Sequence, residues 1–499
     1  MNYLPFPMCH GPNRRDFLRM GLLGLGGLSL GSMVQASALG HDTKPYARHK
    51  SVVFLFLAGG PSQHETFDPK PDAPEGTRCI AGHIPTKIAG VRFASYLPKL
   101  ANLADRLTVV RSFQTNHAEH NGAHKQLLTA DLTVQDGKPI TEPGLGAVYA
   151  RAVGAVHPRT GLPRHALIPP TTRNQAGRAG FNGAFESVVE GSQPAGLGMS
   201  FAPLELYAPL SDGYVEQKQK SRNQPAEQPN PFLDLLEPRL SAAELNNRLE
   251  LLRQLDRLDR QLDVTGTLDK FDQFSRQAAD MLQRGDVRKA LDLSLEDKAT
   301  LQAYDTEHFR NWNCDANSKF IRNGPSVGFS LGRQLLLARR LCEAGCGFVT
   351  VINANWDFHA RKEIPNIPEG MSVFGPPLDH AVSAFLEDIR QRGLEDQILL
   401  VITGEFGRTP GIDKNLGRHH WPRLCPLVFA GGGLRHGQVI GDSDRRGGEP
   451  ASQPITIADL HATILHTLFD VGQMRLDASL PEIVHDRAQR GTPIRELFA

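Results

Sequence analysis

Runs of consecutive apolar residues alternate with helix-forming segments along most of the 499-residue chain. The clearest run covers 51–57, reads Ser-Val-Val-Phe-Leu-Phe-Leu and stops just before Gly59-Gly60. A run without polar alternation is typical of a central parallel strand that is covered on both faces. Four further strands are predicted, at 107–110, 348–352, 398–403 and 426–430.

Helices are predicted between these strands. One covers about 327–344 and ends at Gly345, another covers about 378–392 and ends at Gly393, and a third begins near Thr456. Strand–helix–strand order with buried strands predicts an α/β fold, with a doubly wound, mostly parallel central sheet that is flanked by helices.

The middle of the chain has a different character. Between about 160 and 238 the periodicity fades and Pro, Gly, Asn and Gln dominate, which predicts extended loops. A helix is then expected from Ser241, where Ser241 to Glu244 form a capping box and leucines follow at helical spacing. We therefore expect one large domain over 48–499 with a loop-rich and helical insertion at about 160–325.

The N-terminus has the three parts of a twin-arginine signal peptide. Arg14-Arg15 precede an apolar stretch over 20–34, and Ala36-Ser37-Ala38 offer a cleavage site. The apolar stretch has about 15 residues, whereas a membrane-spanning helix needs about 20. We expect residues 1–38 to direct the folded protein to the twin-arginine translocase and to be removed in the periplasm or outside the cell. No later segment is apolar and long enough to span a membrane.

Charge and cysteine content exclude some classes of partner and cofactor. The formal net charge of +1 gives no overall attraction to nucleic acid. The six cysteines contain no Cys-x-x-Cys pair, so neither a zinc knuckle nor a haem attachment is expected. Cys342 and Cys346 lie four residues apart, and two buried thiols are favoured there over a disulfide.

Carboxylates and imidazoles follow the ends of the predicted strands. They are Glu65 and Asp68 after the first strand, Asp357 and His359 after 348–352, Glu405 after 398–403, and His419 and His420 before the last. In such sheets ligands bind beyond the carboxyl ends of the strands. Imidazole and carboxylate together bind zinc, manganese or iron, and carboxylates also bind calcium or magnesium. Each residue also has an ordinary structural alternative, such as a turn, a cap or an ion pair.

A further group of histidines precedes Leu127. If the segment is helical, His117, His120 and His124 share one face, because they are spaced by three and four residues. Such a face either binds a metal or forms a polar helix start that lines the same crevice and favours phosphate or sulfate.

Several motifs together resemble the exported family known as domain of unknown function 1501, a branch of the alkaline phosphatase and sulfatase superfamily. They span nearly the whole chain after the signal, at 56–63, 66–71, 356–359, 404–410, 417–422 and the helix from Ile457. The resemblance implies a hydrolase of phosphate or sulfate esters that binds a divalent metal (zinc, calcium, magnesium or manganese). The implied ligands are Glu65, Asp357, His359, Glu405 and His420. His117, His124, Asp68 and His419 are candidates for the surrounding pocket.

The resemblance leaves the nucleophile open. Sulfatases carry Cys or Ser about nine residues before a Leu-Leu-Thr-Gly, and here that position is His120, before Leu127-Leu128-Thr129. Formylglycine chemistry is therefore not expected, and a metal-bound water is the alternative. The candidate catalytic residues are His120, Ser112 and Arg408. Arg408 would hold an ester oxygen or, alternatively, pair with Glu405.

Two functions follow from these residues. The first is a metal-dependent hydrolase that acts on an anionic ester or polymer in the cell envelope. The second is a binding or maturation protein that is stabilised by metal and has no turnover. A nicotinamide or flavin enzyme is disfavoured, because the glycines after the first strand do not form Gly-x-Gly-x-x-Gly.

Overall fold

A computed structural model describes residues 44–169, 184–206, 285–311, 329–360 and 364–498. Its frame is an eight-stranded sheet with the strand order β12-β4-β11-β8-β1-β7-β5-β6. At its centre β1 (Ser51–Leu57) pairs in parallel with β7 (Phe348–Asn353) and with β8 (Ile398–Thr403). Six of the seven residues of β1 are buried, which explains the apolar run in the sequence.

The remaining strands extend the sheet on both sides. On one side β5 (His165–Ile168) pairs in parallel with β7, and β6 (Leu204–Glu205) pairs in parallel with β5. On the other side β11 (Leu427–Gly431) runs antiparallel to both β8 and β4 (Leu107–Val110), and β12 (Gln438–Ile440) is parallel to β4. The sheet is therefore mostly parallel, as the sequence predicts, with β11 reversed.

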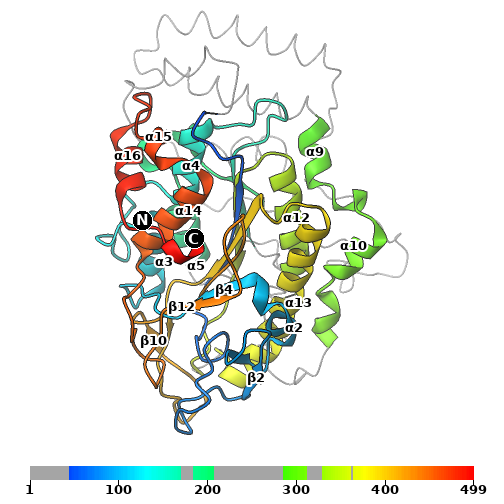
Figure 1. Ribbon diagram of the computed structural model, residues 1–499, viewed down its shortest axis with the longest axis vertical. Coiled ribbons are helices and arrows are strands. Elements are labelled where there is room, and N and C mark those ends of the chain that lie inside the picture. The colour runs from blue at the N-terminus through cyan, green and yellow to red at the C-terminus, as the bar shows by residue number, and fades with distance from the viewer. Residues whose placement is uncertain (1–43, 170–183, 207–284, 312–328, 361–363, 499) are drawn as a thin grey trace, which may run out of the picture.

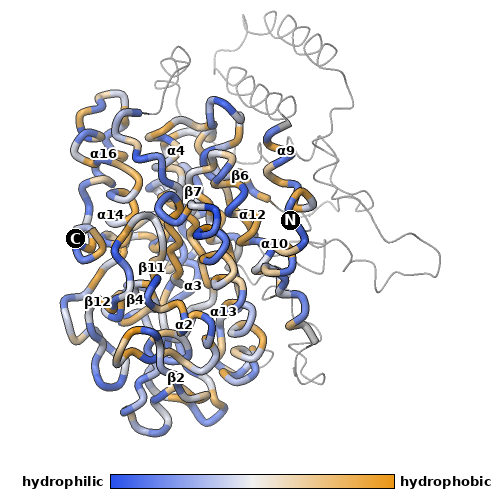
Figure 2. Tube along the Cα trace, turned by 45° about the vertical axis from the view of Figure 1, so that its right-hand side comes forward, coloured by the Kyte–Doolittle hydropathy of each residue, from blue (hydrophilic) through white to orange (hydrophobic). Residues whose placement is uncertain are grey.

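Helices cover both faces of the sheet, so the fold is doubly wound (Figure 1). On one side lie α12 (Leu331–Glu343) and α13 (Ile367–Gln391), with α9 (Gly285–Leu291) and α10 (Lys298–Ala303) outside them. On the other side lie α3 (His120–Thr129), α4 (Leu145–Val153), α5 (Ala184–Gly191), α14 (Ile457–Leu468), α15 (Val471–Met474) and α16 (Glu482–Gln489). Figure 2 shows the hydrophobic residues concentrated on the inner strands and helix faces.

Shorter elements complete the described chain. Two small antiparallel sheets join β2 (His83–Pro85) to β3 (Arg92–Ala94) and β9 (Gly407–Arg408) to β10 (His420–Trp421). The short helix α2 covers Pro98–Asn102. Single 3₁₀ turns lie at Ala104–Arg106, Ala195–Leu197, Met199–Phe201, Leu293–Leu295, Glu307–Asn311 and Arg495–Leu497.

The structure differs from the sequence prediction in two elements. The helix predicted at 378–392 begins at Ile367, with Asn366 as its cap, and continues through Pro376 and Pro377. Prolines usually end a helix, so the pattern concealed its first half. The predicted insertion at about 160–325 contains β5, which is hydrogen-bonded in the central sheet. Its first part therefore belongs to the core of the fold.

Some predictions fall outside the described residues, namely the signal peptide over 1–38 and the helix from Ser241. Within the described chain, Cys79, Cys342, Cys346 and Cys425 are free and buried, so Cys342 and Cys346 are two thiols. Among the described helices, none combines the length and apolar character that crossing a membrane requires.

This topology brings several loops to one edge of the sheet. The parallel strands β1, β7, β8 and β4 all end at that edge, and the antiparallel β11 begins there. The chain that precedes β11, including β10, therefore arrives beside the loops that follow the parallel strands. Residues that are far apart in the sequence can meet at this place, as ligand-binding residues do in other sheets of this kind.

Candidate metal centre

The loop after β8 places the carboxylate of Glu405 against the loop after β1. The side chain of Glu405 is 0% exposed, and its two oxygens lie 2.9 and 3.1 Å from the main-chain nitrogen of Gly59, which donates to them. Gly59 has a φ of +115°, and a Cβ there would lie 2.6 Å from the main-chain nitrogen of Trp356. Only glycine fits this close approach, which joins the β1 and β7 loops.

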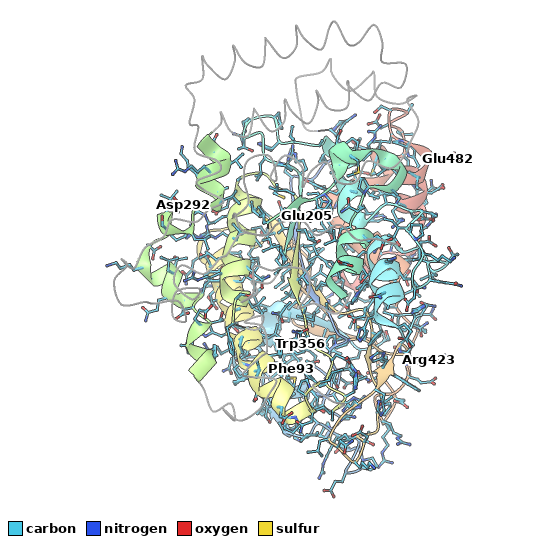
Figure 3. The ribbon with its side chains drawn as sticks, turned by 180° about the vertical axis from the view of Figure 1, so that it is seen from behind. Phe93, Glu205, Asp292, Trp356, Arg423 and Glu482 are labelled. Carbon is cyan, nitrogen blue, oxygen red and sulfur yellow. The ribbon has the colours of Figure 1, made fainter. Side chains whose placement is uncertain are left out.

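The loop after β7 carries Asp357, which lies at the centre of the cluster. Trp356, inside the molecule in Figure 3, fixes this loop, because its indole N–H donates to Asn353 Oδ1 at 2.8 Å. Around the carboxylate of Asp357 lie the Nε2 atoms of three histidines, with His359 at 2.9 Å, His420 at 3.4 Å and His120 at 3.6 Å. The predicted strand-end residues Asp357, His359, Glu405 and His420 are thus brought together.

The first two turns of α3 supply two more imidazoles. His120 is the first residue of the helix, and its Nδ1 lies 2.6 Å from Glu405 Oε1. His124, one turn later, has Nε2 3.1 Å from the same oxygen, while its Nδ1 is hydrogen-bonded to Ser187 Oγ at 2.7 Å. His117 precedes the helix, and its Nδ1 accepts from the main-chain nitrogen of Glu119. The predicted three-histidine face therefore consists of His120 and His124 alone.

Hydrogen bonds determine which nitrogen of each histidine carries the proton. His420 Nδ1 lies 2.7 Å from the carbonyl oxygen of Ala118, and a carbonyl can only accept, so Nδ1 donates. His120 Nδ1 likewise donates to the carboxylate of Glu405. When these imidazoles are neutral, both Nε2 atoms present a lone pair toward Asp357. Three acceptors facing one another are stable only with a cation between them, either a proton or a metal ion.

The pKa values of these side chains also indicate that a positive charge is needed between them. Burial lowers the pKa of His120, but its hydrogen bonds to Asp357 and Glu405 outweigh burial and raise that pKa to about 9. Burial opposes ionisation of Asp357, yet Arg408 and the histidines hold its pKa far below the usual range. The pKa of Glu405 is lowered despite burial by His124 and His120. Both carboxylates are therefore ionised and attract a positive charge.

Two groups of side chains could hold a metal ion, and they share His120. One group is His120, Asp357 and His420, and the other is His120, His124 and Glu405, each with ligand atoms within 4.8 Å of one another. In the first group the side chains are 21–23% exposed, whereas Glu405 and His124 are 0% exposed. Within this cluster the buried His359 Nδ1 has no hydrogen-bond partner among the described residues, and His124 Nε2 contacts only Glu405 Oε1, at 3.1 Å. The donor set therefore fits a metal ion.

The structure gives Arg408 a different partner from the predicted ones. Its guanidinium is 2% exposed and donates to Asp357 Oδ1 at 2.5 Å, to Gly60 O at 2.7 Å and to Arg418 O at 3.1 Å. The main-chain oxygen of Gly59 accepts a further hydrogen bond. Each of its three nitrogens donates to a protein group and the side chain is almost fully buried, so Arg408 neither pairs with Glu405 nor is placed to bind an ester.

Glu65 lies outside the cluster. Its carboxylate is buried and accepts from Arg418 Nη2 at 3.1 Å and from Cys79 Sγ at 2.9 Å. Arg418, which comes from another loop, neutralises the carboxylate of Glu65. The structure therefore does not bring Glu65 to Asp357.

Other predicted residues also have separate environments. Asp68 pairs with Lys70 and Arg111, and His419 lies 3.4 Å from Asp413. The hydroxyl of Ser112 is buried, and a Cβ on Gly441 would lie 2.2 Å from it. These side chains belong to the loops around the cluster, and none is in a candidate metal-binding group of the described chain.

One backbone donor at the start of α3 is used within the protein. The carboxylate of Asp136 accepts from the main-chain nitrogen of Gly122, in the first turn of the helix. A carboxylate of the protein therefore lies at this helix start, where the helix dipole favours negative charge. Asp136 was not among the predicted site residues, because nothing in the local sequence links it to a helix fourteen residues earlier.

Comparisons with known proteins agree with the resemblance seen in the motifs. The family described as protein of unknown function (DUF1501) matches residues 49–476. No curated protein sequence matches the chain.

Solved structures with a similar arrangement include a phosphonate monoester hydrolase from Silicibacter pomeroyi, with 12% identity and a TM-score of 0.35 over 89% of this chain and 76% of that one. A Bacteroides thetaiotaomicron protein from the metabolism of multiple glycosaminoglycans has 10% identity and a TM-score of 0.37 over 90% and 76%. A Pseudoalteromonas sulfatase has 11% identity and a TM-score of 0.31 over 88% and 70%. At these values the activity must be argued from the residues of this chain.

Proposed function

The chain belongs to the DUF1501 family, whose description assigns no function, and from its site we propose a metal-dependent hydrolase of phosphate or sulfate esters in the cell envelope. One observation carries the proposal. Two imidazole nitrogens, His120 Nε2 and His420 Nε2, which present lone pairs when the rings are neutral, face the ionised carboxylate of Asp357 in a partly exposed group.

Exposure of this group favours catalysis over a purely structural metal. Structural metal sites are closed by protein ligands, whereas catalytic sites keep a position open for water or substrate. The side chains of Asp357, His120 and His420 are each more than a fifth exposed, so a bound ion would be reached from solvent. Imidazole-rich donor sets suit zinc better than calcium, magnesium or manganese, which prefer oxygen ligands.

The residues of the chain divide the work as follows. Asp357, His120 and His420 would hold a divalent ion, with His359 beside them. Such an ion, when bound, polarises an ester oxygen and lowers the pKa of water. Arg408 fixes the carboxylate of Asp357 through its 2.5 Å contact.

Other contacts shape the pocket and bear on the nucleophile. The ring of Phe406 packs on those of His120 and His420, with centroid distances of 5.0 and 4.6 Å, and orients both. Ser112 is buried, and the hydroxyl of Thr115 donates to the carbonyl oxygen of Pro422. These environments argue against a serine or threonine nucleophile and favour water.

The environment of Arg408 favours a second candidate function. Because its side chain is 2% exposed and each of its nitrogens donates within the protein, Arg408 is not placed to bind an anionic ester. The alternative is a metal-stabilised binding or maturation protein that keeps the centre without turnover. Turnover itself distinguishes the two candidates.

The test combines metal analysis with an activity screen. Purified protein should contain a divalent metal and hydrolyse at least one member of a panel of aryl phosphates and aryl sulfates. Asp357→Asn should lose metal and turnover, because it removes the carboxylate that three histidines face. Asp413→Asn is the matched control, since the side chain of Asp413 is 24% exposed against 21% for Asp357 and faces His419. Metal without turnover on the panel would support the second candidate, and absence of metal would refute both.

We also propose that residues 1–38 direct export of the folded protein through the twin-arginine translocase to the periplasm or beyond. The support is the Arg14-Arg15 pair, the short apolar stretch and the Ala36-Ser37-Ala38 site. Changing Arg14 and Arg15 to lysine should leave the protein in the cytoplasm. Unchanged export of that variant would refute the proposal.

A further inference from the structure

His120 is the one residue shared by both candidate metal-binding groups of the described chain. Its two ring nitrogens face different carboxylates, because Nδ1 lies 2.6 Å from Glu405 Oε1 and Nε2 lies 3.6 Å from Asp357 Oδ2. The two carboxylates are therefore not equivalent toward a metal ion, and the question is which of them would be a ligand.

The environment of Glu405 is that of a hydrogen-bond acceptor. Both of its oxygens lie within 3.1 Å of the main-chain nitrogen of Gly59, and Oε1 also accepts from His120 Nδ1. A metal ion between Glu405 and His120 Nδ1 would have to displace that 2.6 Å hydrogen bond. Because Glu405 and His124 are both 0% exposed, it would also be closed to a substrate.

The environment of Asp357, in contrast, is that of a metal ligand. His120 Nε2 and His420 Nε2 face it at 3.6 and 3.4 Å, and both present lone pairs when neutral. The carboxylate is also partly exposed. Metal-binding histidines usually donate their second ring N–H to a carboxylate or carbonyl, which orients the ring and raises its basicity. His120 with Glu405, and His420 with the carbonyl oxygen of Ala118, both have this arrangement.

We propose that Glu405 is a positioning residue and not a metal ligand: it accepts the Nδ1 proton of His120 and so leaves Nε2 bare toward a single metal ion at Asp357. This inference rests on the metal-binding part of the proposed function, and it replaces the ligand role that the sequence implies for Glu405. It also predicts one ion per chain, because His120 offers only Nε2.

The first experiment measures the affinity and stoichiometry of zinc and cobalt for metal-free, full-length protein. Wild type should bind one ion. Glu405→Gln keeps an oxygen that can accept from Nδ1, so it should still bind one ion, weakened roughly 10- to 100-fold as for other partners of ligating histidines. Glu405→Ala should be weaker still. The visible absorption spectrum of bound cobalt should keep its shape in Glu405→Gln and change or vanish in Asp357→Asn.

Asp379→Asn provides the control for neutralising a buried carboxylate. Asp379 is 3% exposed and accepts from the main-chain nitrogens of Lys99 and Leu100, as Glu405 accepts from Gly59. Because Asp379 lies outside both candidate metal-binding groups, its variant should bind zinc and cobalt with wild-type affinity.

A second measurement needs no variant and holds even if the Glu405 variants fail to fold. In nitrogen-15 spectra of histidine-labelled, zinc-loaded protein, His120 should show a protonated Nδ1 and a metal-bound Nε2. A metal-bound Nδ1 on His120, two ions per chain, or an altered cobalt spectrum in Glu405→Gln would each overturn the inference while leaving metal-dependent hydrolysis intact. Wild type that binds no metal would overturn the proposed function as well.

Discussion

Replacing Gly59 with alanine should damage the proposed metal centre and the fold together. A Cβ at this position would lie 2.6 Å from the main-chain nitrogen of Trp356 and 2.9 Å from that of Asp357. Both atoms belong to the backbone and cannot rotate away as the end of a flexible side chain would. The loop after β7 must therefore move, and Asp357 must move with it.

The expected magnitude has two parts. An alanine with the φ of +115° found at Gly59 carries backbone strain of about 1–3 kcal/mol. The forced contact adds overpacking of about 1–3 kcal/mol. Gly198→Ala isolates the first part, because Gly198 has a φ of +99° and a Cβ there would meet nothing within 4 Å. If the proposed hydrolysis takes place, displacing Asp357 by about 1 Å is expected to lower its rate on the order of 10²-fold.

Two assays test this prediction. Urea unfolding should show Gly59→Ala to be less stable than Gly198→Ala by about 1–3 kcal/mol. Metal titration should show weakened binding for Gly59→Ala alone, with wild-type binding for Gly198→Ala. If the two alanine variants are equally stable and both bind metal as wild type does, the close approach of the β1 and β7 loops does not position Asp357.

Three further predictions concern stability. Arg408→Lys should lower the free energy of unfolding in urea by about 3–5 kcal/mol, because lysine cannot donate to all the carbonyls and the carboxylate that the guanidinium contacts. Arg423→Lys, at the outer edge in Figure 3, should lower it by less than about 1 kcal/mol. Equal losses in the two variants would contradict the assigned contacts. Burial and the charge of Arg487 lower the pKa of His461 to about 3. The unfolded chain therefore binds a proton below about pH 6.5 that the folded chain does not, so stability present above that pH is lost as the pH falls, by about 2 kcal/mol at pH 5. His461→Gln should remove this part of the difference between unfolding at about pH 7.5 and about pH 5, and an unchanged difference would refute it. Removing bound metal with a chelator should lower the melting temperature. In a sample whose free metal concentration was 100 times the Kd, the free energy of unfolding should fall by about 2.7 kcal/mol. An unaltered melting temperature would contradict the coupling of metal binding to folding.

Features of the fold that depend on residues close together in the sequence can be predicted from the sequence. The strands predicted at 107–110 and 398–403 match β4 and β8 residue for residue, because each is a short, mostly apolar run whose residues are all buried. The capping pattern near Thr456 also gave the start of α14, where Thr456 and Asp459 form the capping box. Convergence of Asp357, Glu405 and His420 followed from strand order, since ligands in such sheets gather at one edge.

Choices among distant partners were not predictable in this way. Glu65 precedes Arg418 by 353 positions, and no local pattern shows that this arginine reaches it. The reversed direction of β11 is similarly hidden, because an apolar run reads the same in a parallel and an antiparallel strand. His117 shares the spacing of a helical face with His120, yet the helix begins only after Glu119. Where a helix starts depends on its cap and on the packing of the chain before it.

The charges of the cluster connect metal binding to the kind of substrate proposed. The carboxylates of Asp357 and Glu405 are balanced by the guanidinium of Arg408 and, in metal-free protein at neutral pH, by the His120 imidazolium, because the pKa of His120 is raised to about 9. The metal-free cluster therefore carries no net charge and offers an anionic ester little attraction. A divalent ion that replaces the proton of His120 makes the cluster positive, and opposite charges attract at close range. An anionic ester should therefore bind more tightly to metal-loaded than to metal-free protein, whether or not the ester is subsequently hydrolysed.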